Sequence, residues 1–143
     1  MIVKETDNEQ EIRTILCNKE IYDAISDDYS PNAEDFIIPF DGYQYIGGYV
    51  GSEIIALMVY HSFRDGRTCH VQVLPQFRNK YAMRFGQESL LFRGNDSLYA
   101  EIPDLYKNVL DFAHKFGFTI IETVKNDYIK NGDSYNMNIL RMD

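Results

Sequence analysis

Hydrophobic residues along the chain switch between the spacing of strands and the spacing of helices. Short apolar runs bounded by turn residues, such as Gly51-Ser52 and Asp65-Gly66, predict strands at hairpin spacing. We expect seven strands in all, at residues 2–4, 43–50, 54–63, 68–74, 97–102, 118–124 and 135–142.

Four helices are expected between these strands. Thr6 and Glu9 fit a capping box before a first short helix, and Asn18 can cap a second one. A third helical pattern covers residues 79–92, and a fourth runs from Asp104 towards Gly117.

The predicted order β-αα-βββ-α-β-α-ββ indicates an α/β protein with a mixed sheet and helices on both faces. The unit spanning residues 68–102 should be a right-handed crossover, so its two strands should be parallel.

The length of 143 residues suits one domain, spanning residues 1–143, with a single core. The longest apolar run, residues 54–60, is too short to cross a bilayer, and residues 1–6 do not resemble a signal peptide. We therefore expect a cytoplasmic protein. The irregular connection 29–42 holds Phe36 and Ile38, so it should pack on the core or line a cleft.

Charge and cysteine usage exclude several classes of function. A net charge of −8 argues against nonspecific binding to nucleic acid or to an anionic membrane. Cys17 and Cys69 lie in different elements and are expected to be reduced thiols. No set of His, Cys, Asp and Glu residues has the spacing of a metal site, and no Ser-His-Asp order suggests a hydrolase.

The most informative stretch is residues 70–92, where a buried strand stops at Pro75 and a basic segment leads into a helix. Backbone N–H groups and the helix dipole at such a junction favour an anion. Arg78 and Lys80 add positive charge, although a solvated basic loop would look the same.

Three segments of the chain resemble the GNAT N-acetyltransferase superfamily. Val-Leu-Pro-Gln-Phe-Arg-Asn-Lys at 73–80 is similar to the exit of the fourth strand of that family, which carries Val-x-Pro-x-x-Arg. Phe-Ala-His-Lys-Phe-Gly-Phe at 112–118 resembles its late helix, and 128–133 resembles the loop before its last strand. The likeness extends over nearly the whole chain and is closest to bacteriophage-encoded GNAT-like proteins, which similarly carry His70 and the Pro75/Arg78 pair.

The resemblance implies that acetyl-CoA is a co-substrate. Its diphosphate would lie on a loop over residues 78–83, and its pantetheine arm would pair with the strand edge at Val71 and Val73. The implied diphosphate-binding residues are Arg78, Asn79, Lys80, Tyr81, Ala82 and Met83.

Two departures from the family pattern bear on activity. Tyr81 and Met83 stand where the family has small residues that let the backbone approach phosphate. They either point into the core or close the site. Ala113 stands where the family often has the tyrosine that protonates the thiolate, and Tyr106 or Tyr99 is a possible substitute.

Three residues are candidates for the base that deprotonates the amine. His70 and His61 lie on strands near the expected cleft, and an unperturbed histidine titrates near neutral pH. Glu101 on the fifth strand is the third candidate. A lone histidine on a sheet is more often a structural residue, and Glu101 could instead be an exposed strand residue. His114 is expected on a solvated helix face.

The sequence thus favours an N-acetyltransferase that acts on an amine of a small molecule or protein. The alternative is a catalytically inactive phage protein of the same fold, working in virion assembly or host interaction. A lesser reading is an inhibitor whose acidic surface engages a basic host target. The acceptor amine and the oligomeric state, including a homodimer, stay open.

Overall fold

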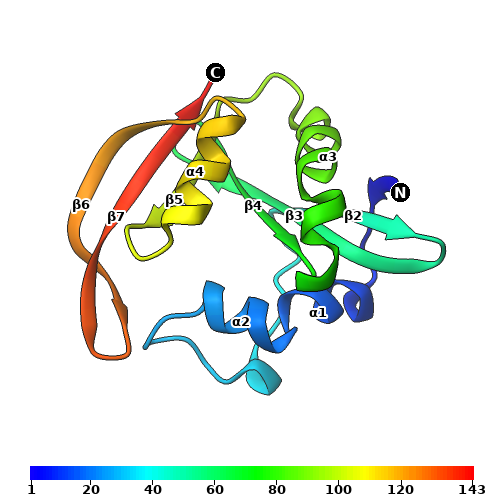
Figure 1. The fold of residues 1–143 in the computed structure, drawn as a ribbon, viewed down its shortest axis with the longest axis horizontal. Coiled ribbons are helices and arrows are strands. Elements are labelled where there is room, and N and C mark those ends of the chain that lie inside the picture. The colour runs from blue at the N-terminus through cyan, green and yellow to red at the C-terminus, as the bar shows by residue number, and fades with distance from the viewer.

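The computed structural model describes all 143 residues and contains one seven-stranded mixed sheet. Along the sheet the strands follow the order β1-β2-β3-β4-β5-β7-β6 (Figure 1). Their bounds are β1 (Ile2–Glu5), β2 (Tyr43–Val50), β3 (Glu53–Phe63), β4 (Gly66–Val73), β5 (Leu98–Pro103), β6 (Thr119–Lys130) and β7 (Asp133–Met142).

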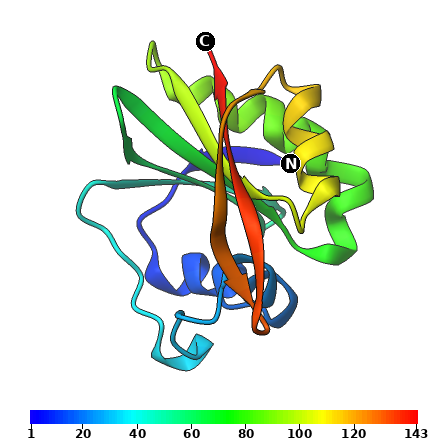
Figure 2. The same ribbon diagram turned by 90° about the vertical axis from the view of Figure 1, so that its left-hand side faces the viewer.

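Four helices cover the two faces of this sheet, and Figure 2 shows the two pairs on opposite sides of it. Their bounds are α1 (Glu9–Leu16), α2 (Lys19–Ile25), α3 (Arg78–Leu90) and α4 (Lys107–Lys115). Short 3₁₀ turns occupy Ala33–Asp35, Pro75–Phe77 and Leu91–Arg93. No helix is long and apolar enough to span a membrane. The predicted α/β class and element order are confirmed.

Each pair of helices buries its own hydrophobic cluster against the sheet. Ile12, Ile15 and Ile21 of α1 and α2 pack with residues such as Leu57 on one face. Phe85 of α3 and Ala113 of α4 pack with residues such as Tyr60 on the other face. Successive side chains of a strand point to opposite faces, so β3 contributes to both clusters.

The predicted parallel crossover is confirmed at β4 and β5, but the pairing is short. Only Arg67 with Leu98 and Thr68 with Tyr99 are in register. Beyond Thr68 the two strands have no paired residues, although β4 continues to Val73 and stays paired with β3 on its other edge. One edge of β4 is therefore free of a strand partner.

Helix starts differ from the predicted ones in two places. The cap of α1 is Asn8, whose side chain accepts from the Glu11 backbone N–H, while Thr6 donates to the Glu11 carboxylate. The fourth helix was expected from Asp104, but β5 ends at Pro103 and α4 begins only at Lys107.

The last hairpin differs most from the prediction, because residues 126–130 are strand and not loop. β6 and β7 are joined by only Asn131 and Gly132. A bulge lies between Val124 and Tyr128, with Asn126 in the left-handed region at φ 57°. The bulge interrupts the alternation of side chains between the two faces of the sheet. The sequence of residues 126–130 therefore looks like that of a polar loop.

Candidate active site

A cleft of about 390 Å³ opens where β4 and β5 separate. It passes between the two halves of the sheet, since its lining comes from both helix layers as well as from the strands. Of its 21 lining residues 15 are hydrophobic, which suits an apolar ligand body oriented by few polar groups. The polar and ionisable side chains of the lining include Asp27, His70, Gln72, Glu101, Tyr106 and Tyr128.

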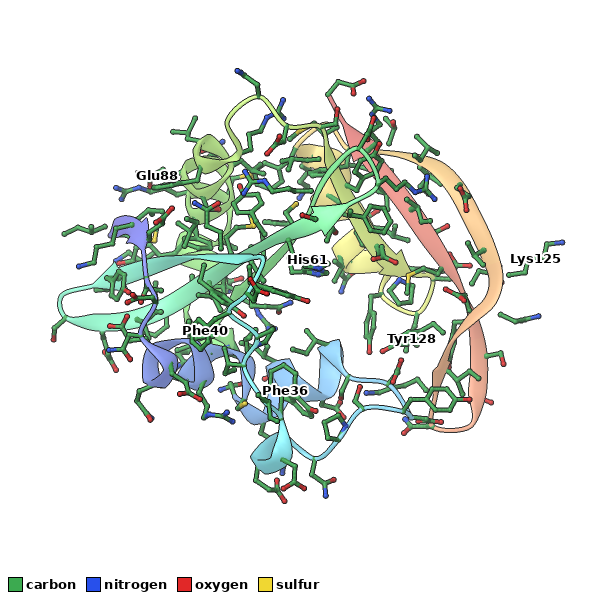
Figure 3. The ribbon with its side chains drawn as sticks, turned by 180° about the vertical axis from the view of Figure 1, so that it is seen from behind. Phe36, Phe40, His61, Glu88, Lys125 and Tyr128 are labelled. Atoms are coloured by element: carbon green, nitrogen blue, oxygen red, sulfur yellow. The ribbon has the colours of Figure 1, made fainter.

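His61 and His70 lie side by side on one face of the sheet. Their Nε2 atoms are 3.2 Å apart, and their rings meet edge to edge, with centroids 5.3 Å apart and planes at 13° to one another. His70 lines the cleft. Burial, and then the neighbouring His61, lower the pKa of His70 from 6.5 to about 4. His70 is therefore neutral at pH 7, with a lone pair available to accept a proton. Figure 3 views this face, with His61 labelled on β3.

Glu101 of β5 also lines the cleft, across from His70, which lies on β4. Its carboxylate forms no hydrogen bond with the protein. Burial raises its pKa, and His61 opposes that shift by stabilising the negative charge. The structure thus brings together all three side chains that the sequence suggests as bases.

Tyr106, suggested as the acid for the thiolate, lines the cleft at the start of α4. The Tyr128 hydroxyl donates to the Ser26 carbonyl at 2.9 Å, so its only proton is used. The 3.3 Å contact between the two hydroxyls therefore has Tyr106 donating to Tyr128. Burial raises the pKa of Tyr128.

Tyr128 belongs to a clamp that holds the tip of the β6–β7 hairpin against the end of α2. Lys130 donates to the Asp23 and Ser26 carbonyls, and the Asp28 carboxylate accepts from the backbone N–H groups of Asn131 and Gly132. The clamp closes the cleft on the side of α2. Sequence reasoning missed Tyr128 because it placed that residue in a polar loop; its signal was an aromatic residue in an otherwise polar stretch.

The residues suggested for diphosphate binding form the first turns of α3 and not a loop. The 3₁₀ turn Pro75–Phe77 runs directly into the helix at Arg78, and no side chain caps the helix start. The first N–H groups of a helix have no partners within it, so an anion site remains chemically possible there. None of these residues lines the 390 Å³ cleft.

Arg78 is engaged within the protein. Its Nε donates to the Val73 carbonyl at 3.0 Å, and its Nη1 lies 3.4 Å from a Glu20 carboxylate oxygen. The guanidinium therefore ties the end of β4 to the start of α3. The Lys80 ammonium lies 5.3 Å from the centroid of the Tyr81 ring, which is a cation–π distance.

Neither Tyr81 nor Met83 fills the gap between β4 and β5. Tyr81 packs against the core cluster beneath α3, and Met83 is 40% exposed. Of the two residues suggested for the pantetheine arm, Val71 lines the cleft, whereas the Val73 side chain is buried in the core.

The low pKa of His70 makes stability depend on pH. Between pH 6.5 and about 4 the unfolded chain binds a proton at His70 that the folded chain does not, so the free energy of unfolding falls as pH is lowered. Relative to His70→Gln, wild type should lose up to about 2 kcal/mol between pH 7 and pH 5.

Urea unfolding at both pH values measures this difference. Glu101 acts in the opposite sense, because its raised pKa favours proton binding by the folded state, and His61 faces His70 from β3. Both groups are present in the two proteins, so the comparison isolates His70. The same change in unfolding free energy with pH in wild type and in His70→Gln would contradict the expectation.

Solved structures with a similar arrangement include acetyltransferases. An N-acetyltransferase from Staphylococcus aureus Mu50 has a TM-score of 0.76 at 14% identity, over 99% of this chain and 97% of that chain. yncA from Salmonella typhimurium, solved with its cofactor acetyl-CoA, has a TM-score of 0.78 at 15% identity, over 100% of this chain and 93% of that chain. An acetyltransferase of the GNAT family from Streptococcus pneumoniae has a TM-score of 0.75 at 10% identity, over 99% of this chain and 98% of that chain.

The chain therefore has the fold of the GNAT acetyltransferases. No family model matches the sequence, and no curated protein matches it. Identities of 10–15% establish the fold, so activity has to be argued from the site.

Proposed function

We propose that the chain is an acetyl-CoA-dependent N-acetyltransferase that acetylates an amine of a small molecule or protein. The observation that carries the proposal is the juxtaposition at the β4–β5 cleft. There a strand edge without a partner lies beside two ionisable side chains, His70 and Glu101, that have free acceptor atoms.

The free edge of β4 fits an extended ligand that carries amide groups. Backbone N–H and C=O groups beyond Thr68 have no strand partner on the β5 side, and an extended chain can add to such an edge through main-chain hydrogen bonds. The pantetheine arm has the required amides. Val71 would offer it an apolar contact from within the cleft.

Acetyl-CoA would supply a thioester, whose acetyl group is activated for attack by an amine. Transfer forms a nitrogen–carbon bond, breaks the carbon–sulfur bond, releases one proton from nitrogen and leaves sulfur as a thiolate. His70, neutral at pH 7, would accept the proton released from nitrogen, and its lowered pKa makes it a weaker base than a free histidine. Glu101 is the second candidate for this role.

Tyr106 is the proposed acid for the thiolate. Its proton is directed at Tyr128 in this structure, so protonation of sulfur would require its hydroxyl to rotate. A thiolate is a tolerable leaving group, and acid assistance is typically worth ~10²–10⁴-fold.

Mass spectrometry of a panel of amines tests the proposal. The protein is incubated with acetyl-CoA and each amine, and an amine product heavier by one acetyl group is expected together with free CoA thiol. The reaction should stop when the protein is omitted. Free thiol without an acetylated amine would mean thioester hydrolysis, and would contradict amine transfer.

A catalytically inactive protein with a role in virion assembly or host interaction is the second candidate. The observation that favours it is the start of α3, where Arg78 is held by Val73 and Glu20 and no glycine-rich loop is present. Absence of acetyl-CoA binding would favour this candidate. Acetylation of any amine, lost in His70→Ala, would exclude it.

We also propose three further features of the chain. One sheet joins both ends of the chain, which supports a single domain over residues 1–143. An origin in a bacteriophage, and hence a place in the host cytoplasm, is supported only by the sequence pattern around His70 and Pro75. A homodimer is a further proposal, to be tested by light scattering.

A further inference from the structure

We infer that His61 is a positioning residue that fixes His70 in the tautomer with its proton on Nε2 and its free lone pair on Nδ1, inside the cleft. The catalytic part of this inference rests on the proposed function, since it specifies which atom of His70 would take the proton from the amine. The location of the proton does not depend on that function and is tested separately.

The proton positions follow from one backbone carbonyl. His61 Nδ1 lies 3.2 Å from the Ser62 carbonyl oxygen, which can only accept, so His61 carries its proton on Nδ1. In a neutral ring the other nitrogen is then an acceptor. His61 Nε2 lies 3.2 Å from His70 Nε2, and so His70 must donate from Nε2.

The remaining nitrogen of His70 is open to a ligand. A neutral imidazole with its proton on Nε2 has an unprotonated Nδ1, and this atom has no hydrogen-bond partner in the protein. It is also not among the fully buried side-chain atoms that lack a hydrogen bond. Nδ1 is therefore accessible, and the side chain that carries it lines the cleft.

His61 is itself held in place by aromatic contacts. The Tyr43 ring lies on its other side, with centroids 4.8 Å apart, and Tyr43 stacks in turn with Tyr45 at 6.2 Å. Tyr45 is 3% exposed and donates its hydroxyl proton to the Pro39 carbonyl. Tyr45 and Tyr43 of β2 thus hold the His61 ring in place, and His61 in turn contacts His70 at the cleft.

Nitrogen-15 NMR of the imidazole rings tests the proton positions in the full chain at pH 7.5. In wild type, His70 should show a protonated Nε2 and an unprotonated Nδ1, and His61 the reverse. His61→Gln retains an acceptor oxygen and should preserve the His70 tautomer. His61→Leu has similar bulk without an acceptor and should shift His70 towards a mixture of tautomers. A His70 proton on Nδ1 in wild type, or an unchanged tautomer in His61→Leu, would overturn the inference.

Kinetics of the same variants test the positioning role. His61→Leu should lower kcat about 10-fold or more while KM for acetyl-CoA stays unchanged, and His61→Gln should recover most of the loss. Equal losses in both variants would overturn the role. If no amine is acetylated by wild type while the NMR result is as expected, the proposed function fails and the assignment of the proton stands.

Discussion

Replacing His70 with glutamine is expected to lower kcat/KM for amine acetylation by about 10²–10⁴-fold. His70 is the neutral histidine that lines the cleft, and it has one nitrogen free of protein partners. Glutamine has comparable size and can donate to His61, but it cannot accept a proton at neutral pH. The loss should therefore fall on the chemical step, with the affinity for acetyl-CoA preserved.

Steady-state kinetics with the best amine of the panel, and calorimetry with acetyl-CoA, measure the two quantities. A matched control is His114→Gln, since His114 is exposed on α4 and does not line the cleft. That variant should keep wild-type activity. A His70→Gln protein with activity within about twofold of wild type would remove His70 as the base and leave Glu101 as the candidate.

Truncation of Phe85 to alanine is expected to cost about 3–5 kcal/mol of unfolding free energy, the largest stability effect we predict. Phe85 is 0% exposed and anchors α3 on the sheet. Its ring occupies the space that a side chain at position 48 would need, because a Cβ at Gly48 would lie 2.7 Å from it. The helix can collapse little into the resulting void, since the sheet backbone lies beneath it.

Urea unfolding followed by circular dichroism measures this cost. Leu91→Ala is the matched control, because Leu91 lies just past α3, is 81% exposed and should change stability by less than about 0.5 kcal/mol. A cost below about 1 kcal/mol for Phe85→Ala would mean that α3 is not held by this contact. Since Gly86 and Leu90 of α3 line the cleft, loosening the helix should also weaken acetyl-CoA binding.

The order of elements could be predicted from the sequence because it depends on local spacing. Apolar alternation in β2 and β3 and the helical stripe of α4 are short-range patterns that burial enforces. The candidate bases could also be predicted from the sequence. His61, His70 and Glu101 lie on three predicted strands, and the hairpin and the crossover make these strands neighbours in the sheet.

Other features depend on contacts between distant residues, which local spacing does not encode. The Tyr128 hydroxyl bonds to Ser26, 102 positions away. The bulge at Asn126 breaks the alternating pattern of β6, so the sequence does not show that Tyr128 lies on a strand. At the start of α3 the family resemblance implied a loop over residues 78–83, whereas the helical pattern predicted a helix from residue 79, and the structure has the helix. Arg78 instead bonds back to Val73 and helps the helix to begin immediately after the 3₁₀ turn.

The central claim is that the β4–β5 cleft holds acetyl-CoA, and calorimetric titration tests it most directly. Wild type should bind one acetyl-CoA per chain with a negative heat-capacity change, and Val71→Phe should lose that binding, because the larger ring fills the cleft from β4. Titration at two temperatures guards against a binding enthalpy near zero at one of them. No heat at either temperature with saturating acetyl-CoA, together with no rise in thermal stability, would contradict the claim.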